Sequence, residues 1–177
     1  YKVELTVDGQ TLTENFDLLR DPRISATDED LQAQFDLMIE IRNKLVDNND
    51  GLSRLRSVRS QINDWIDHTT DQATKDALTK SGDQIEKKLC AIEDQLASVH
   101  EPNAQTVPPV RLDAKLMALS QVVASGDFGP TQGQLGVIDE LSKLVDDNLE
   151  TLQYVIDNDV AAFIEQVSEL GLPTISH

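Results

Sequence analysis

The chain has 177 residues, a formal net charge of −17 and an aromatic content of only 4%. This negative charge argues against nucleic acid and anionic membrane surfaces as partners, because like charges repel one another. No apolar run approaches the roughly 18 residues of a transmembrane helix, so the sequence predicts no membrane span. The length suits one domain with a sizeable core, which must be aliphatic because aromatic residues are scarce.

The first 23 residues are the only part with a β pattern. Apolar and polar residues alternate from Tyr1, and Asp8-Gly9 interrupts the alternation, which is the strongest short-range signal of a hairpin with a type I′ turn. Pro22 predicts an extended linker after the strands. Because a lone hairpin is marginal in water, we interpret residues 1–23 as the last strand pair of a preceding sandwich domain, with packing on the helices or pairing with another copy as alternatives. The start at Tyr1 in mid-pattern favours a longer parent protein.

A long apolar stripe runs from Thr27 to His68. Its members recur at seven-residue spacing in two series, and further apolar residues broaden it beyond two positions per heptad. The two series are Leu31, Met38, Leu45, Leu52 and Ile66, and Ile41, Leu55 and Ile62, and the broadening residues are Phe35, Ile39, Val46, Val58 and Trp65. We therefore predict a single helix over about 28–68 that faces a bundle core. Gly51 weakens its middle, but the register is the same on both sides of it.

Three further helices are predicted, over about 71–99, 112–125 and 132–170. Each carries apolar residues on one face, and Thr131 with Gln134 forms a capping box for the last helix. Short loops favour antiparallel neighbours. The predicted fold is therefore mostly α, with an antiparallel up-down-up-down four-helix bundle over 24–177 that contains two long helices and follows an N-terminal β-hairpin.

One stretch, Asp47-Asn48-Asn49-Asp50-Gly51, looks like a calcium-binding loop. If Gly51 is the sixth position of such a loop, Val46 is the first and Ser57 the twelfth, where strong oxygen ligands belong. Because both end ligands are lacking and the stretch lies in a helical register, we do not predict calcium binding there.

Other reactive residue types occur without the partners that catalysis needs. His68 and His100 fall near helix ends, where they complement the helix dipole, and no Glu-x-x-His motif is present. Cys90 has no local activating base and is predicted to be a small, partly buried residue. Trp65 lies on the apolar stripe and is predicted to be a core residue. We assign no catalytic, cofactor-binding or metal-ligating residue and no cofactor.

Several segments carry a resemblance to a known family. In chain order they are Tyr1-Lys2-Val3-Glu4-Leu5-Thr6-Val7-Asp8-Gly9-Gln10, Asp21-Pro22-Arg23, Asp30-Leu31-Gln32-Ala33-Gln34-Phe35, Pro109-Val110-Arg111-Leu112 and Gly129-Pro130-Thr131. Together they resemble the C-terminal region of large secreted bacterial proteins with BNR or sortilin-like β-propeller repeats, which are often labelled glycosyl hydrolases. The resemblance implies that the strand pair ends an immunoglobulin-like sandwich and that a helical region follows. It also implies a periplasmic or extracellular location, and it carries over no catalytic residue because any hydrolase label belongs to the propeller.

Three functions fit these observations. The first is a non-catalytic helical accessory or interaction module at the C-terminus of such a secreted protein, in contact with other domains of its parent chain or with another protein. The second is a ligand-binding or hydrolase domain with a site at the bundle end near Trp65. The third is self-association with a second copy through the hairpin or an exposed apolar stripe.

Overall fold

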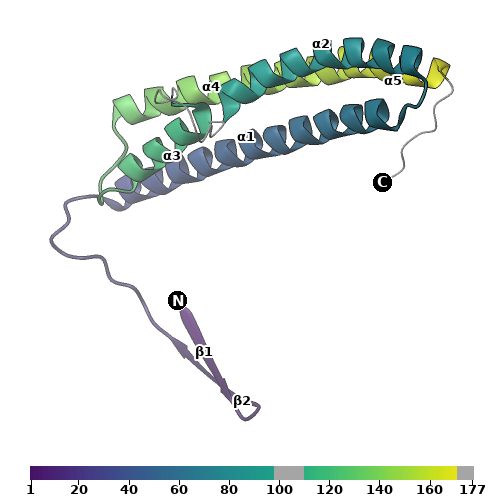
Figure 1. The fold of residues 1–177 in the computed structure, drawn as a ribbon. Helices are drawn as coiled ribbons and strands as arrows, with labels where there is room; N and C mark the ends of the chain where they lie inside the picture. Colours follow the sequence, from purple (N-terminus) through teal and green to yellow (C-terminus); the bar gives the residue numbers. More distant parts are fainter. Residues whose placement is uncertain (98–109, 171–177) are drawn as a thin grey trace, which may run out of the picture.

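The protein folds as a bundle of long helices preceded by an antiparallel β-hairpin, as predicted (Figure 1). The computed structural model describes residues 1–97 and 110–170. The elements are β1 (Lys2–Val7), β2 (Gln10–Asn15), α1 (Asp28–His68), α2 (Gln72–Leu96), α3 (Leu112–Val123), α4 (Gln132–Val155), the π-helical turn η1 (Ile156–Val160) and α5 (Ala161–Glu169).

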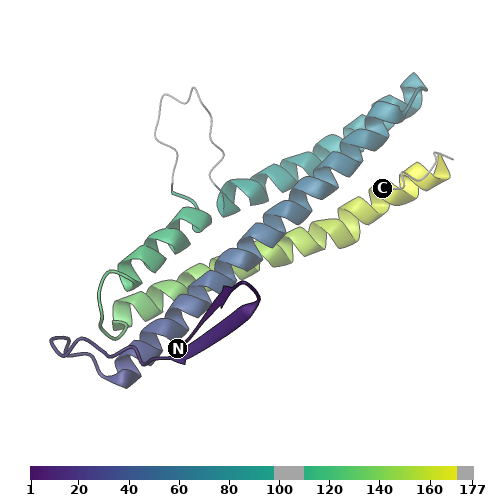
Figure 2. The same cartoon turned by 90° about the horizontal axis from the view of Figure 1, so that it is seen from below.

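The direction of α3 differs from the predicted alternation. The Asn48 side chain donates to the Leu96 carbonyl, which places the end of α2 beside the middle of α1. The Gln34 side chain donates to the Val123 carbonyl, which places the end of α3 beside the start of α1. Consequently α2 and α3 both run antiparallel to α1, one after the other, and the bundle has three rods in cross-section (Figures 1 and 2).

Lengths explain why α2 and α3 share one rod. The 25 residues of α2 cover only the C-terminal part of the 41-residue α1, and the 12 residues of α3 cover its N-terminal part. This placement buries the apolar stripe of α3, which consists of Leu112, Leu116, Leu119 and Val123. The last residues of the helix predicted over about 71–99, from residue 98 on, lie outside the described residues.

Helix α1 is continuous from Asp28 to His68, as the unbroken heptad register predicted. It begins with a capping box in which the Thr27 hydroxyl accepts from the Asp30 backbone and the Asp30 carboxylate accepts from the Thr27 backbone. Gly51 does not break the helix because it lies in the core, where Leu149 of α4 packs directly against its Cα. The missing side chain therefore makes room for a neighbouring helix.

The core is aliphatic and receives side chains from every rod. Leu55 of α1, Leu89 of α2, Leu116 of α3 and Val145 of α4 are all completely buried. Phe163 of α5 extends the same core toward the far end and packs against Trp65, with ring centroids 6.2 Å apart. Trp65 was predicted to be a core residue, and it is partly buried and packs against the core.

The two polar residues that interrupt the stripe of α1 both fix α2 in place. Asn48 is fully buried, and its amide lies 3.3 Å from the Leu96 carbonyl, where it satisfies an acceptor at the open end of α2. Arg59 reaches across to α2 and donates to Glu86 at 2.8 Å and to Glu93 at 2.6 Å. Arg56 donates to the second oxygen of Glu93 at 2.8 Å, so this nearly buried carboxylate holds two arginines of α1.

The Glu93 cluster should make stability depend on pH. Burial raises the pKa of Glu93, but hydrogen bonds from Arg59 and Arg56 outweigh it and hold the pKa below its ordinary value of 4.5. A carboxyl with a depressed pKa stabilises the fold above its unfolded pKa, and this contribution is lost as pH falls through the folded pKa. We expect Glu93→Gln to cost about 1–3 kcal/mol at pH 7, and the difference from the wild type should shrink below pH 4.5.

Urea unfolding of both proteins at pH 7 and at pH 3 checks this expectation. Glu140→Gln is the matched control, because Glu140 is exposed and makes no ion pair among the described residues. An unchanged difference between wild type and Glu93→Gln at the two pH values would contradict the assignment.

The last rod is helical from Gln132 to Glu169 but is not one regular α-helix, which corrects the single helix predicted over 132–170. Its core residues Ile138, Val145 and Leu152 are seven residues apart, and so are Val160 and Val167, whereas Val160 follows Leu152 at eight. The extra residue is absorbed in η1, whose wider turn returns Val160 and Phe163 to the core.

The hairpin has the predicted turn. Asp8 and Gly9 both have positive φ, 48° and 79°, which is the requirement of a type I′ turn. The ends of the pair are joined by two backbone hydrogen bonds between Tyr1 and Phe16, whose rings also stack. Every residue of β1 and β2 is exposed, and the hairpin stands clear of the bundle (Figure 1).

Candidate interaction surface

One face of the hairpin is apolar and uncovered. In the antiparallel register Leu5 lies opposite Leu12, Val3 opposite Glu14 and Val7 opposite Gln10, and opposed residues share a face. The hairpin face therefore consists of Tyr1, Val3, Leu5, Val7, Gln10, Leu12, Glu14 and Phe16. All six apolar members are at least half exposed, and the opposite face carries only polar side chains. An amphipathic two-stranded sheet of this kind is normally half of a larger packing unit.

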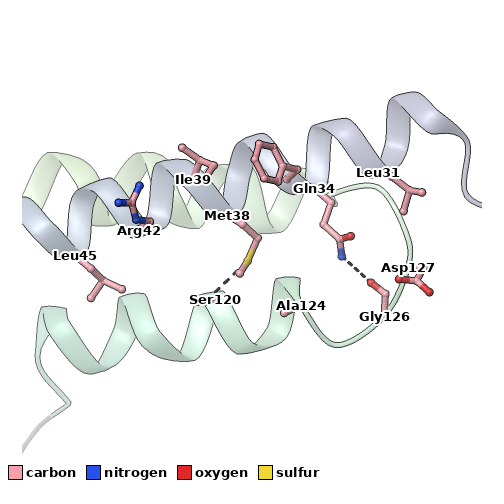
Figure 3. A pocket seen from close by; sticks show the side chains of 11 residues that line it. Leu31, Gln34, Met38, Ile39, Arg42, Leu45, Ser120, Ala124, Gly126 and Asp127 are labelled. Carbon is pink, nitrogen blue, oxygen red and sulfur yellow. Dashed lines mark hydrogen bonds between the residues drawn. The ribbon is translucent and has the colours of Figure 1, made fainter. Parts of the chain in front are cut away.

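A second apolar surface lies between α1 and α3. This α1–α3 groove has a volume of about 570 Å³ and is lined by Leu31, Gln34, Phe35, Met38, Ile39, Arg42, Leu45, Ser120, Ala124, Gly126 and Asp127. Figure 3 shows Met38 and Leu45 pointing from α1 toward α3, so aliphatic side chains form the floor of the groove. Its polar groups lie mainly at the rim and the two ends.

Two hydrogen bonds fix the end of the groove where Gln34 lies. The Gln34 amide donates to the Val123 carbonyl at 2.7 Å and to the Gly126 carbonyl at 2.6 Å, which fixes the turn after α3 against α1. These two carbonyls belong to the end of α3 and would otherwise lack partners. The groove therefore has a defined shape.

An apolar ridge borders the groove on α1. Phe35 is 58% exposed, and together with Ile39 it also lines a second recess between α1 and α4 that contains Lys44, Asp47 and Ser142. A phenylalanine this exposed between two recesses is typical of a contact surface. The sequence prediction placed Phe35, Ile39 and Val46 on the core stripe, but Phe35 and Val46 are exposed, which corrects it.

Only two charged residues, of those that the structure describes, line the α1–α3 groove. Arg42 lies at the rim toward the Leu45 end, and Asp127 lies at the opposite end (Figure 3). Among the described residues Arg42 makes no ion pair and no side-chain hydrogen bond. An unpaired guanidinium beside aliphatic surface is suited to pair with a carboxylate of a partner.

The stretch that looks like a calcium-binding loop and His68 both lie in α1. The Asp47–Gly51 stretch is helical, and His68 lies at the end of α1 with a ring nitrogen 2.7 Å from the Asp64 carbonyl, as predicted. Across residues 1–97 and 110–170, no cluster of three or more histidine, cysteine, aspartate or glutamate side chains is placed to hold a metal ion. His100 lies outside the described residues.

Cys90 differs from its predicted partial burial and is exposed. Its sulfur lies beside Arg59 of α1 and Glu86 of α2. Its thiol donates to the Glu86 carboxylate at 3.0 Å, and this hydrogen bond, aided by burial, raises the pKa of the thiol. A raised pKa disfavours the thiolate and hence nucleophilic reactivity.

The sequence shows an extra line of apolar residues on α1, but periodicity alone could not reveal what these residues contact. Phe35, Ile39 and Val46 are spaced by four and seven residues, which defines a line beside the main stripe of α1. Such a line means either a wider core contact or a second surface, and only the position of α3 decides between them.

No family model, no curated protein and no solved structure matches this chain. Among the described residues, no helix combines the length and apolar character needed to cross a membrane.

Proposed function

We propose that this chain is a non-catalytic helical accessory module that acts by binding protein surfaces. By the resemblance of its sequence, it belongs to a larger secreted protein in the periplasm or outside the cell, and hydrolase activity resides in the propeller of that protein. Its partners are other domains of the parent chain, another protein or a second copy of itself. The net charge of −17 disfavours nucleic acid.

The observation that carries the proposal is the pair of uncovered apolar surfaces. The hairpin face and the α1–α3 groove expose large apolar side chains such as Leu12, Phe16 and Phe35. Contiguous apolar surface is unfavourable in water, and in stable proteins it marks contact sites. The long α1 and the last rod provide a rigid scaffold that separates the hairpin from the far end of the bundle.

Site-specific photo-crosslinking tests this function. A benzoylphenylalanine at Leu12 lies on the hairpin face, whereas the same group at neighbouring Thr13 lies on the polar face and serves as the matched control. In the protein as its source cell makes it, we expect protein crosslinks from position 12 and few from position 13. Equal or absent crosslinking would overturn the proposal, and so would turnover of a glycoside by the chain itself.

A further inference from the structure

We infer that the hairpin face docks on the α1–α3 groove of a second copy of this chain, and that the contact is reciprocal. This inference rests on the proposed function, because it names the partner of the same surface. A reciprocal contact of two identical chains has twofold symmetry, so each hairpin covers the groove of the other chain and both apolar surfaces are buried.

Charge complementarity supports the hairpin face as the surface that docks on the α1–α3 groove. Glu14 is the only charged residue on the hairpin face, where it stands opposite Val3 among apolar neighbours. Arg42 is the basic residue of the groove, and it has no ion-pair partner in the described parts of the chain. A carboxylate surrounded by aliphatic surface and a guanidinium at the rim of an aliphatic groove match in both charge and setting.

The linker favours a second copy over the same chain. The Arg20 guanidinium donates to the Ala26 carbonyl at 2.7 Å and to the Asp28 carboxylate at 3.1 Å, which ties the linker into a loop at the start of α1. Beyond this loop the hairpin lies apart from its own bundle (Figure 1). The hairpin face therefore stays exposed and can contact another molecule, and the groove of its own chain stays uncovered.

The size of the contact predicts its strength. Six residues per strand at about 3.3 Å each, with strands about 4.8 Å apart, give a face of roughly 20 by 10 Å including side chains. Two reciprocal contacts of this size bury roughly 800 Å² in total, which is below the range of stable interfaces and typical of weak, transient association.

Charge reversal in trans tests the inference. Glu14→Arg and Arg42→Glu are prepared separately, and sedimentation velocity is measured at about 10–500 μM, a range that brackets micromolar dissociation constants. We expect the wild type to dimerise and each variant alone to dimerise at least about tenfold more weakly, since every contact then opposes like charges. An equimolar mixture of the two variants should dimerise like the wild type. In the mixed dimer the introduced arginine meets the introduced glutamate at one contact, and the other contact retains the original pair of Glu14 and Arg42.

Matched controls keep the result specific. Glu4→Arg changes a charge on the polar hairpin face, and Lys80→Glu changes one on α2 outside the groove, so both should leave the dimer unchanged. Circular dichroism melting verifies that every variant is folded. A wild type that stays monomeric, or a mixture that dimerises no better than its components, would overturn the inference. Persisting Leu12 crosslinks to a different protein would then leave the proposed function in place.

Discussion

Deleting Asn158 should leave the bundle folded, with its free energy of unfolding changed by less than about 1 kcal/mol, because π-turns are strained insertions in α-helices. Leu152 and Val160 are eight residues apart across η1, so removal of one residue restores the seven-residue spacing. Asn158 is exposed, and its amide only donates to the Tyr154 carbonyl at 2.8 Å. A regular α-helical turn supplies that carbonyl with a backbone donor instead.

Deleting Ser53 from α1 is the matched control and should unfold the protein. Ser53 is also exposed, but α1 has an unbroken heptad register on both sides. Loss of one residue rotates everything after it by about 100° and carries Leu55 and Ile62 out of the core. Each such loss costs about 2–5 kcal/mol, and a typical domain has only about 5–15 kcal/mol in total. Thermal melting followed by circular dichroism separates the two outcomes, and equal damage from both deletions would disprove the role assigned to η1.

Substituting Gly51 by alanine should destabilise the fold by about 1–3 kcal/mol, the usual cost of overpacking a core, although alanine is the better helix former. A Cβ at position 51 would overlap the Cδ2 atom of Leu149, and this partly buried side chain must move from its contact with α1. Gly136→Ala in α4 should have the opposite sign, because a Cβ there meets nothing within 4 Å and the helix gains about 1 kcal/mol of propensity.

A double substitution tests whether Leu149 is the cause. Leu149→Ala alone creates a cavity, but in the Gly51→Ala background it makes room for the new methyl group. We therefore expect the double variant to be more stable than the sum of the single effects predicts, by at least about 0.5 kcal/mol. Guanidinium unfolding of the four proteins gives this coupling, and additive effects would show that the overlap is relieved elsewhere.

The sequence was sufficient to predict those features of the fold that depend on a local pattern of residues. The heptads of α1 predicted its continuity through Gly51, Thr27 and Thr131 predicted two helix starts, and Asp8-Gly9 predicted the turn. In each case the determining residues lie within a few turns of one another, so no knowledge of distant contacts was needed.

Features that depend on contacts between distant segments were not predictable. The direction of α3 follows from which half of α1 the shorter α2 leaves uncovered, and this depends on the whole packing. The eight-residue step from Leu152 to Val160 is visible in the sequence, but alternative apolar neighbours such as Ile156 conceal it. The exposure of Phe35 was not predictable for the same reason. An extra line of apolar residues on a helix can face the core or the solvent, and only the positions of the neighbouring helices decide which.

The division of one rod into α2 and α3 has a consequence for how the molecule opens. The two halves of the bundle share α1 and the last rod, and α2 meets α3 at one end, where Arg111 pairs with Asp94. Because each half has its own short helix, we expect the two halves to exchange their amide hydrogens as separate cooperative units. The only tryptophan, Trp65, packs against Phe163 in the half that contains α2. Its fluorescence therefore follows that half alone and does not sense fraying around α3.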